Sequence, residues 1–274
     1  MVIGIDVGGT KTETVLFDES GNEVKKKVLE SAHPSCATPE KMKEILKQSL
    51  LDETSEIVIG YAGYGKSKRM RDVIKEAVCS AFEGRKYVLL NDIELALWSL
   101  LGGRDGIVLI LGTGSIALKR KNNVLTRAGG WGYLLGDEGS GYAVGRDILR
   151  KFVLEADGIK RKTELYEEVM KLYNIRNSSE ILDKVMQSGN VNRTEVAKCA
   201  VLSTLEENRS ILTNQAKQVA ELVNSIREEG LEVIVTGGMS RNSVYMDILK
   251  EYIPGMNISQ VEPVYGAYLY SENN

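Results

Sequence analysis

Hydrophobic and polar positions at the start of the chain alternate in short blocks that predict strands and tight turns. Val2–Val7 is a run of mostly β-branched residues ended by Gly8-Gly9, as expected for a buried strand that runs into a turn. Two further strands are predicted at Glu13–Asp18 and Glu23–Glu30, with Ser20-Gly21-Asn22 as the turn between them. The pattern therefore predicts a β-meander.

Beyond Glu30 the apolar spacing alternates between the helical period and short apolar runs, which predicts an α/β sheet. The expected helices are Pro39–Leu51, Lys68–Phe82 and Ile93–Leu101, and the expected strands are Ile57–Tyr61 and Tyr87–Leu90. A glycine-rich linker follows at Leu101–Gly106.

After this linker, the early plan of apolar strand, Gly/Thr turn and paired strands is repeated. The expected strands are Ile107–Leu111, Ser115–Arg120, Val124–Arg127 and Glu232–Thr236, with a mostly helical stretch from Gly139 to about Glu229 and later helices ending near Tyr252 and at Val264–Tyr270. We expect two domains, residues 1–103 and 104–263. The second carries a helical insertion, and a C-terminal helix at 264–274 packs back on the first.

Composition narrows the class of protein. A chain of 274 residues is long enough for two compact cores, and its formal net charge of -3 favours neither nucleic acid nor an anionic membrane as a partner. Cys36, Cys79 and Cys199 lack the spacing of a disulfide framework or a zinc site, which fits a reducing cytoplasm. No basic leader or apolar stretch of ~20 residues is present, so we expect a cytoplasmic protein whose partners are small molecules.

The first candidate site is Gly4–Thr12. Glycines let backbone N–H groups approach phosphate closely, a threonine hydroxyl adds a hydrogen bond, and the carboxylate of Asp6 at the strand end can hold Mg²⁺ through waters. The expected phosphate contacts are Gly8, Gly9, Thr10, Lys11 and Thr12. The alternative is a hairpin that needs glycine only for its turn.

The second candidate is Leu89–Asp92, where a buried strand ends in polar residues just before a helix. Asn91 and Asp92 would open on a ligand site, and Asp92 could act as general base. The alternative role of Asp92 is a helix N-cap.

Three glycine-rich segments lie in the second predicted domain. Gly112-Thr113-Gly114-Ser115 predicts a second phosphate-binding turn, or else a plain hairpin. Gly129–Gly141 is rich in glycines, among them Gly130, and also contains Trp131, Asp137 and Glu138. This combination is expected for a loop that binds sugar hydroxyls and an apolar ring face, or else for a long acidic segment that leads into a helix. Gly237 and Gly238 follow a buried strand and could lie against adenosine, or else form a bare strand-to-helix connection.

In this order, the five segments resemble the sugar kinase/Hsp70/actin superfamily. The loop Gly-Gly-Trp-Gly followed by Gly-Asp-Glu-Gly-Ser looks like the N-acetylglucosamine kinase branch, grouped with the BadF/BadG/BcrA/BcrD ATPases, and the resemblance spans Ile3 to Ala267. It implies two actin-like (ribonuclease H-like) ATPase domains with a nucleotide-binding cleft between them, and ATP and Mg²⁺ as cofactors. By this resemblance, the phosphates would be contacted by Thr10, Thr12, Gly112 and Gly114, and Mg²⁺ would be assisted by Asp6. Asp92 would be the base. The sugar site would be lined by Thr113, Trp131 and Asp137, and the adenosine site by Gly237 and Gly238.

The chain departs from this family pattern in the acceptor loop. Ser31–Ser35 places His33 where the kinase branch usually has an asparagine, so His33 is either a sugar contact or a solvent-exposed loop residue. The helical part is shorter than in typical relatives, which bears on oligomer contacts, and a homodimer is one assembly left open.

The resulting hypothesis is ATP-dependent phosphorylation of a sugar hydroxyl, with an amino sugar such as N-acetylglucosamine or glucosamine as the acceptor. The main alternative is an activator ATPase of 2-hydroxyacyl-CoA dehydratases or benzoyl-CoA reductases, which resembles Gly63-Tyr64-Gly65-Lys66 but uses closely placed cysteines for an iron–sulfur cluster. A non-catalytic sugar or nucleotide sensor is a third reading. The basic stretch Lys66–Arg71 is interpreted as a solvated helix start.

Overall fold

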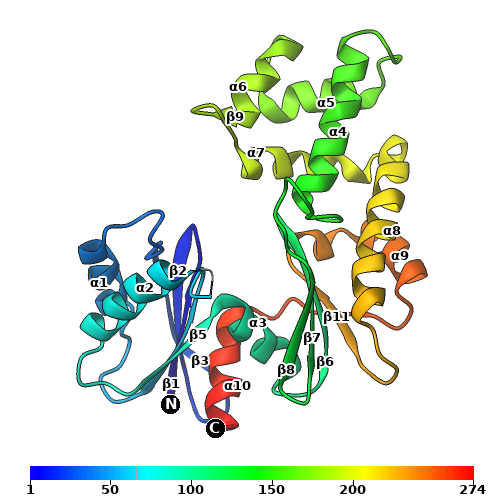
Figure 1. Ribbon diagram of the computed structural model, residues 1–274. Helices are drawn as coiled ribbons and strands as arrows, with labels where there is room; N and C mark the ends of the chain where they lie inside the picture. The colour runs from blue at the N-terminus through cyan, green and yellow to red at the C-terminus, as the bar shows by residue number, and fades with distance from the viewer. Residues whose placement is uncertain (66) are drawn as a thin grey trace. The chain divides into compact units, whose positions relative to one another are not determined.

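A computed structural model describes residues 1–65 and 67–274 of the chain (Figure 1). Lys66, which ends the Gly63–Lys66 motif and begins the basic stretch, lies outside these residues. The chain forms two compact units, one of residues 1–104 with 261–274 and the other of residues 105–260. Unit 1 is therefore built from two stretches of chain that are far apart in the sequence. The cleft expected between the two domains stays a prediction.

Unit 1 contains a five-stranded sheet in the order β3-β2-β1-β4-β5. Strands β1 and β2 and strands β2 and β3 pair antiparallel, whereas β4 is parallel to both β1 and β5. The strands are β1 (Val2–Val7), β2 (Lys11–Phe17), β3 (Glu23–Glu30), β4 (Glu56–Tyr61) and β5 (Tyr87–Asn91). The helices are α1 (Pro39–Gln48), α2 (Lys68–Ala81), α3 (Asp92–Leu101) and α10 (Gly266–Glu272), the last preceded by the 3-10 turn η5 (Pro263–Tyr265).

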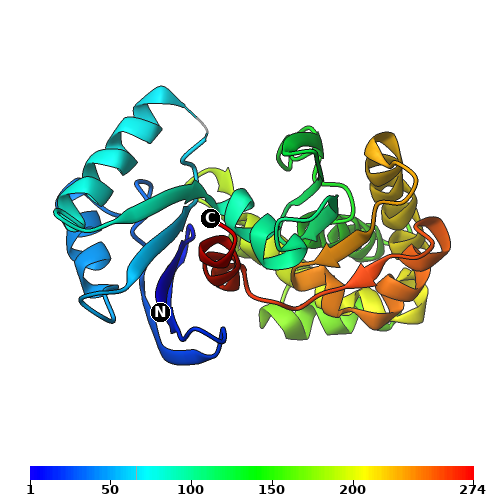
Figure 2. The ribbon, with the colours of Figure 1, turned by 90° about the horizontal axis from the view of Figure 1, so that it is seen from below.

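Alternation along the strands gives the unit 1 sheet two buried faces. Ile3 and Ile5 of β1 belong to the cluster that includes Ile45 of α1 and Ile74 of α2. Val2, on the opposite face, belongs to a second cluster with residues of α3, η5 and α10. Figures 1 and 2 show α1 and α2 on one side of the sheet and α3 and α10 on the other.

Glycine sets the distance between α10 and its neighbours. A Cβ at Gly266 would lie 2.0 Å from the backbone oxygen of Leu95, and a Cβ at Gly4 would lie 2.8 Å from Ala267 Cβ. Because real Cβ atoms do not approach that closely, α10 can pack against α3 and β1 only through these glycines.

Unit 2 repeats the strand plan of unit 1. Its sheet order, β8-β7-β6-β11-β12, has the same antiparallel and parallel pairings as β3-β2-β1-β4-β5. The strands are β6 (Gly106–Leu111), β7 (Ser115–Lys121), β8 (Val124–Gly129), β11 (Val233–Thr236) and β12 (Asn257–Ile258). The expected α/β class, with two sheets of one plan, is confirmed.

A helical insertion separates β8 from β11 where unit 1 has only α1. Its helices are α4 (Gly141–Ala156), α5 (Glu164–Tyr173), α6 (Ile181–Val185), α7 (Arg193–Lys198) and α8 (Arg209–Ile226), with the 3-10 turns η1 (Ser178–Glu180), η2 (Cys199–Thr204) and η3 (Glu206–Asn208) and the hairpin strands β9 (Met186–Gln187) and β10 (Asn190–Val191). After β11 come η4 (Gly238–Arg241) and α9 (Ser243–Tyr252). The apolar faces of α4, α5, α8 and α9 share one core with β6 and β11.

No helix in residues 1–65 and 67–274 combines the length and the apolar character of a membrane span.

Candidate active site

One edge of the unit 1 sheet collects the polar residues predicted from the sequence. Strands β1, β4 and β5 run parallel, so their carboxyl ends lie at the same edge. Asp6 lies near the end of β1, and Asn91 and Asp92 lie at the junction of β5 and α3. The first and second candidate segments therefore lie at one edge of the same sheet.

Asp6 is the most perturbed carboxyl group at this edge. Burial and, to a lesser extent, the neighbouring carboxylates of Asp92, Glu13 and Glu262 together raise its pKa to about 7, while Lys11 acts in the opposite direction. Glu13 is directly opposite Asp6 in the β1–β2 register. A site with this much negative charge is electrostatically suited to a cation.

Asp92 is not the N-cap of α3. Asn91 holds that position: its side-chain oxygen accepts from the Glu94 N–H at 2.7 Å, and the Glu94 carboxylate accepts from the Asn91 N–H at 2.9 Å. Asp92 is the first helical residue and is half-buried. Capping, the alternative role that the sequence offered for Asp92, is thus performed by its neighbour. The sugar contact expected of Asn91 stays a prediction.

The Gly8–Thr12 turn is tied to the loop after β3. Ser31 Oγ donates to the Gly8 carbonyl at 2.7 Å, and Cys36 Sγ donates to the Gly9 carbonyl at 3.2 Å. Gly9 and Thr10 are exposed at the tip, where a phosphate could reach them.

Thr12 and Lys11 have partners within unit 1. Thr12 is fully buried, and its hydroxyl accepts from the Ala32 N–H at 3.0 Å, which fixes the start of the acceptor loop. Lys11 pairs with Glu13, which also pairs with Lys26 at 2.6 Å. The phosphate contacts expected of Thr12 and Lys11 stay predictions.

His33 is half-buried in this loop. Its Nδ1 accepts from the Ser35 N–H at 3.1 Å and shares a hydrogen bond of 2.7 Å with Ser35 Oγ. This pattern assigns the proton of the neutral imidazole to Nε2. Nε2 is directed toward Gly63, since a Cβ built there would lie 3.1 Å from it. Gly63 has a φ of +81°, so the turn after β4 requires glycine beside the ring.

In unit 2, the Gly112–Ser115 turn is joined to the start of α4. The Gly141 N–H donates to the Gly112 carbonyl at 2.8 Å, and the Tyr142 N–H donates to the Thr113 carbonyl at 3.2 Å. The third and fourth candidate segments are therefore in direct contact.

Asp137 lies against this turn and is buried. Its Oδ1 accepts from the Ser115 N–H at 3.3 Å, and its Oδ2 accepts from Arg193 Nη2 at 3.1 Å. A Cβ at Gly114 would lie 2.9 Å from Oδ2, so glycine is needed there to admit the carboxylate. The sugar contact expected of Asp137 stays a prediction.

The other predicted residues of the Gly129–Gly141 loop have different surroundings. Trp131 is 68% exposed, and the Arg127 guanidinium lies 4.6 Å from its ring centre. Gly130 adopts a φ of +71° just before it. The Glu138 carbonyl accepts from Ser115 Oγ at 2.6 Å, which fixes the backbone of Glu138. The side-chain roles expected of Trp131 and Glu138 stay predictions.

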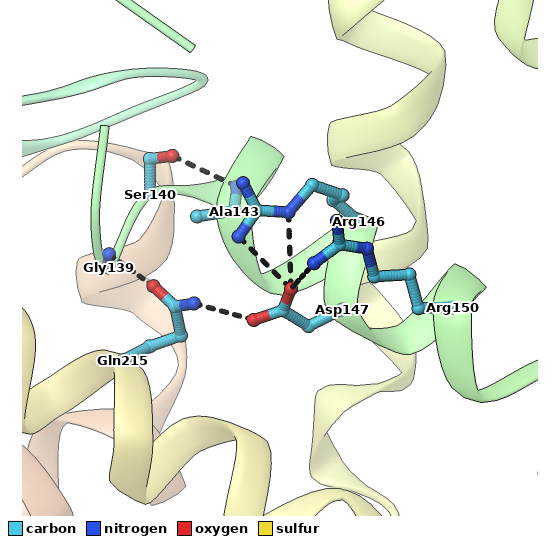
Figure 3. A network of polar contacts seen from close by, with 7 residues as sticks. All are labelled: Gly139, Ser140, Ala143, Arg146, Asp147, Arg150 and Gln215. Carbon is cyan, nitrogen blue, oxygen red and sulfur yellow. Dashed lines mark hydrogen bonds and ion pairs between the residues drawn. The ribbon is translucent and has the colours of Figure 1, made fainter. Parts of the chain in front are cut away.

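A partly buried polar network holds the end of this loop (Figure 3). Gln215 of α8 accepts from the Gly139 N–H at 2.7 Å and donates to Asp147 Oδ2 at 2.7 Å. Asp147 also pairs with Arg146 at 3.1 Å. The entry of α4 is thereby anchored to α8 as well as to the glycine turn.

A cavity of about 660 Å³ opens beside the second turn in unit 2. Its wall includes Gly112, Thr113 and Gly141, parts of α7 and η2, and Gly238, Arg241 and Asn242 of the η4 region. Gly237 has a φ of +100°, and a Cβ there would lie 2.6 Å from the Leu111 carbonyl oxygen. The second glycine turn and the fifth candidate segment thus share one cavity, which has room for a nucleoside.

Sequence reasoning missed Arg193, Gln215 and the cavity residues of α7. Arg193 lies 56 positions after Asp137 and Gln215 lies 76 positions after Gly139, on helices whose spacing indicates only amphipathic packing. The motif at Asn192–Glu195, a capped helix start, signals a helix and no ligand.

The model of the BadF/BadG/BcrA/BcrD ATPase family matches residues 3–271. The chain belongs to this ATPase family. Two curated relatives of this BadF-family chain are matched over most of their lengths. An N-acetylmuramic acid/N-acetylglucosamine kinase of Clostridium acetobutylicum is 27% identical over 89% of the chain and 87% of its own length. An N-acetyl-D-glucosamine kinase of Dictyostelium discoideum is 29% identical over 99% and 98%.

Solved structures share the fold of this BadF-family chain. A protein of Chromobacterium violaceum, provisionally named an N-acetylglucosamine kinase, has a TM-score of 0.80 at 22% identity, over 98% of this chain and 97% of its own. A ROK family glucokinase of Streptomyces griseus, solved with glucose and AMPPNP, has a TM-score of 0.58 at 18% identity, over 99% and 98%. The predicted family and the actin-like fold class are confirmed.

Proposed function

We propose that this protein is an ATP-dependent kinase that phosphorylates a hydroxyl of an amino sugar, with Asp92 as general base. The observation that carries the proposal is the match to two relatives named as N-acetylglucosamine kinases over 87% and 98% of their lengths. The arrangement of polar residues in each unit supports the same chemistry.

Unit 1 offers the carboxylates that such a reaction needs. Asp92, released from capping by Asn91, would accept a hydrogen bond from the acceptor hydroxyl, orient it and take its proton as the oxygen attacks the γ-phosphorus. The new bond joins that oxygen to phosphorus, and the bond to the β-phosphate oxygen breaks.

Asp6 fits a role beside Mg²⁺. Burial and neighbouring carboxylates raise its pKa, a bound cation would favour its charged form, and Mg²⁺ usually binds through one or two carboxylates together with substrate phosphates. Within residues 1–65 and 67–274, no three His, Cys, Asp or Glu side chains are grouped as metal ligands. Asp6 would therefore hold the ion with the nucleotide, and the ion would supply charge neutralisation at the phosphates.

Unit 2 offers a cavity that could receive the nucleotide. Gly112 and Thr113 would meet phosphates at one end, and Gly238 with Gly237 would lie against adenosine at the other. The cavity of about 660 Å³ lies within the range of small-molecule sites. The neighbouring loop would supply Trp131 for an apolar sugar face and Asp137 for sugar hydroxyls. Cytoplasmic location and assembly as a homodimer stay predictions.

ADP release with Mg²⁺ and ATP, measured over hexoses, amino sugars and N-acetyl sugars, tests the proposal. We expect turnover with an amino sugar and a loss of about 10²–10⁴-fold in kcat for Asp92→Asn. Asp72→Asn, an exposed carboxylate of α2, is the matched control and should retain wild-type turnover. Equal kcat in Asp92→Asn and wild type would reject Asp92 as the base.

The activator ATPase alternative is not favoured. Cys199 is buried, and burial raises its thiol pKa to about 12, so it is poorly suited to bind iron as a thiolate. The sensor alternative predicts sugar binding without ADP release, which the same assay detects.

A further inference from the structure

Asp137 has a backbone and side chain that need support from elsewhere in unit 2. Its φ is +69°, a left-handed conformation that non-glycine residues adopt at a cost, and its side chain is only 4% exposed. A buried carboxylate is stable only when it is paired and hydrogen-bonded. The cation paired with it among the described residues is Arg193.

Arg193 is itself held in place by the loop that contains Asp137. The residue begins α7, whose N-cap Asn192 accepts from the Glu195 N–H at 3.2 Å. The guanidinium carbon lies 5.3 Å from the ring centre of Tyr133, and that ring meets Tyr142 edge-on at 5.2 Å. Arg193 therefore contacts the loop through both a charge and an aromatic ring.

The hydrogen bonding of this guanidinium is directed to Asp137. Arg193 Nε is buried and has no hydrogen-bond partner among the described residues, whereas Nη2 donates to Asp137 at 3.1 Å. The side chain is otherwise 41% exposed. Because this long, partly exposed side chain is held with its guanidinium on the Asp137 carboxylate, we interpret its role as more than packing.

The same residues adjoin the cavity wall. Thr194 and Glu195, directly after Arg193, line the cavity, as do Gly112 and Thr113 of the turn that receives the Asp137 carboxylate. A ligand in the cavity would therefore contact the two segments that hold Asp137.

We propose that Arg193 is a positioning residue that orients the Asp137 carboxylate toward the acceptor sugar and couples that carboxylate to occupancy of the nucleotide cavity. This inference rests on the proposed function, because it assumes that Asp137 binds the sugar. Coupling of this kind is reciprocal: nucleotide raises sugar affinity by the same factor as sugar raises nucleotide affinity.

Steady-state kinetics with the best acceptor of the sugar panel, together with calorimetric binding of that sugar with and without AMPPNP, test the role of Arg193. In Arg193→Met we expect the KM for sugar to rise about tenfold with a smaller change in kcat, and the effect of AMPPNP on sugar affinity to be lost. Arg193→Lys keeps the charge but loses the planar donors, and should recover part of the sugar affinity.

Two controls separate positioning from stability. Lys171→Met removes a cation from an exposed ion pair with Glu168 on α5 and should leave both constants unchanged. In an Asp137→Asn background, Arg193→Met should have little further effect on the KM for sugar, because the group it positions is already altered.

The outcomes are distinct. A wild-type KM for sugar and intact coupling in Arg193→Met and Arg193→Lys would overturn the inference while the kinase assignment stands. Independent, additive effects of the Asp137 and Arg193 substitutions would also overturn it. If Arg193→Met does not fold, the soluble Arg193→Lys variant decides by the same KM and coupling measurements. A wild-type protein that phosphorylates no sugar would remove the proposed function itself.

Discussion

Asp6 is buried and lies opposite Glu13 of β2, and the carboxylates of Asp92 and Glu262 also act on it. The raised pKa, about 7, means that folding favours the protonated acid relative to the unfolded chain, where the value is 3.8. Between these values the folded state binds more protons than the unfolded state. The contribution of Asp6 to stability is therefore fully present below about pH 4 and is lost as the pH rises through about 7.

Replacing Asp6 by Asn should remove this pH dependence in the metal-free protein. Because the neutral amide avoids the cost of a buried charge, we expect Asp6→Asn to be more stable than wild type by on the order of 2–4 kcal/mol at pH 8, with the gain shrinking toward pH 4. Urea unfolding in EDTA at several pH values checks this. A constant difference across the range would contradict the pKa shift.

Gly114 makes a second prediction at the residue scale. A Cβ there would lie 2.9 Å from Asp137 Oδ2, so Gly114→Ala must displace the carboxylate. We expect a KM for sugar raised about tenfold, since the steric cost is of the same size as a lost hydrogen bond to a charged group. Kinetics on the folded variant, verified by circular dichroism, measure it. An unchanged KM would show that Asp137 does not bind the sugar.

At the scale of single residues, the sequence indicated positions that the backbone conformation restricts to glycine, but it did not indicate which side chains contact each other. Gly114 and Gly237 could be singled out as turn positions because a glycine after a buried strand has few physical explanations. Arg193 could not, because an arginine on an amphipathic helix is ordinary and its partner is set by tertiary packing. Asp92 had two explanations; the capping geometry of Asn91 removes the N-cap role, and the general-base role stays a prediction.

At the scale of elements, most strands could be predicted, because a short continuous apolar run between two turns favours a strand over a helix. The expected strand Glu23–Glu30 agrees with the structure at both ends. Short elements were missed: the hairpin of β9 and β10 and the strand β12 have two residues per strand. Tertiary contacts rather than periodicity hold such elements.

Packing of α10 leads to a prediction at this scale. Gly266→Ala would place a methyl group 2.0 Å from the Leu95 carbonyl oxygen and force α10 away from α3. We expect a loss of about 1–3 kcal/mol in the free energy of unfolding, as for other overpacked cores. Glu272→Ala, at an exposed position of the same helix, is the control for chemical denaturation. Equal stability of the two variants would mean that α10 packs less tightly than described.

The whole molecule is organised as two units whose apolar clusters share no residue. The cluster of unit 2 contains only residues between Ile107 and Met256, whereas the cluster around Val2 and Val58 in unit 1 needs Val264 and Ala267. The repeat of one sheet plan was visible in the sequence as a second Gly/Thr turn between strands. The arrangement of helices in the insertion was not, because amphipathic periodicity does not specify which helices pack together.

Because the two units share no apolar cluster, we expect each unit to fold without the other. A fragment of residues 105–260 should unfold cooperatively by itself, because its apolar cluster is complete. Residues 1–104 alone should expose Val2, Val15 and Phe17, and should fold only when 261–274 is fused to them. Thermal unfolding followed by circular dichroism compares the three fragments. Cooperative unfolding of 1–104 without 261–274 would refute this dependence.

The split composition of unit 1 also has a consequence for synthesis on the ribosome. The strands of unit 1 emerge first, but the segment that covers one face of their sheet emerges only after all of unit 2 has been translated. At about 5–20 residues per second this delay is roughly eight to thirty seconds. During that time the nascent chain carries an apolar sheet face that only α3 can cover, and such a surface is prone to aggregation, while unit 2 can already fold.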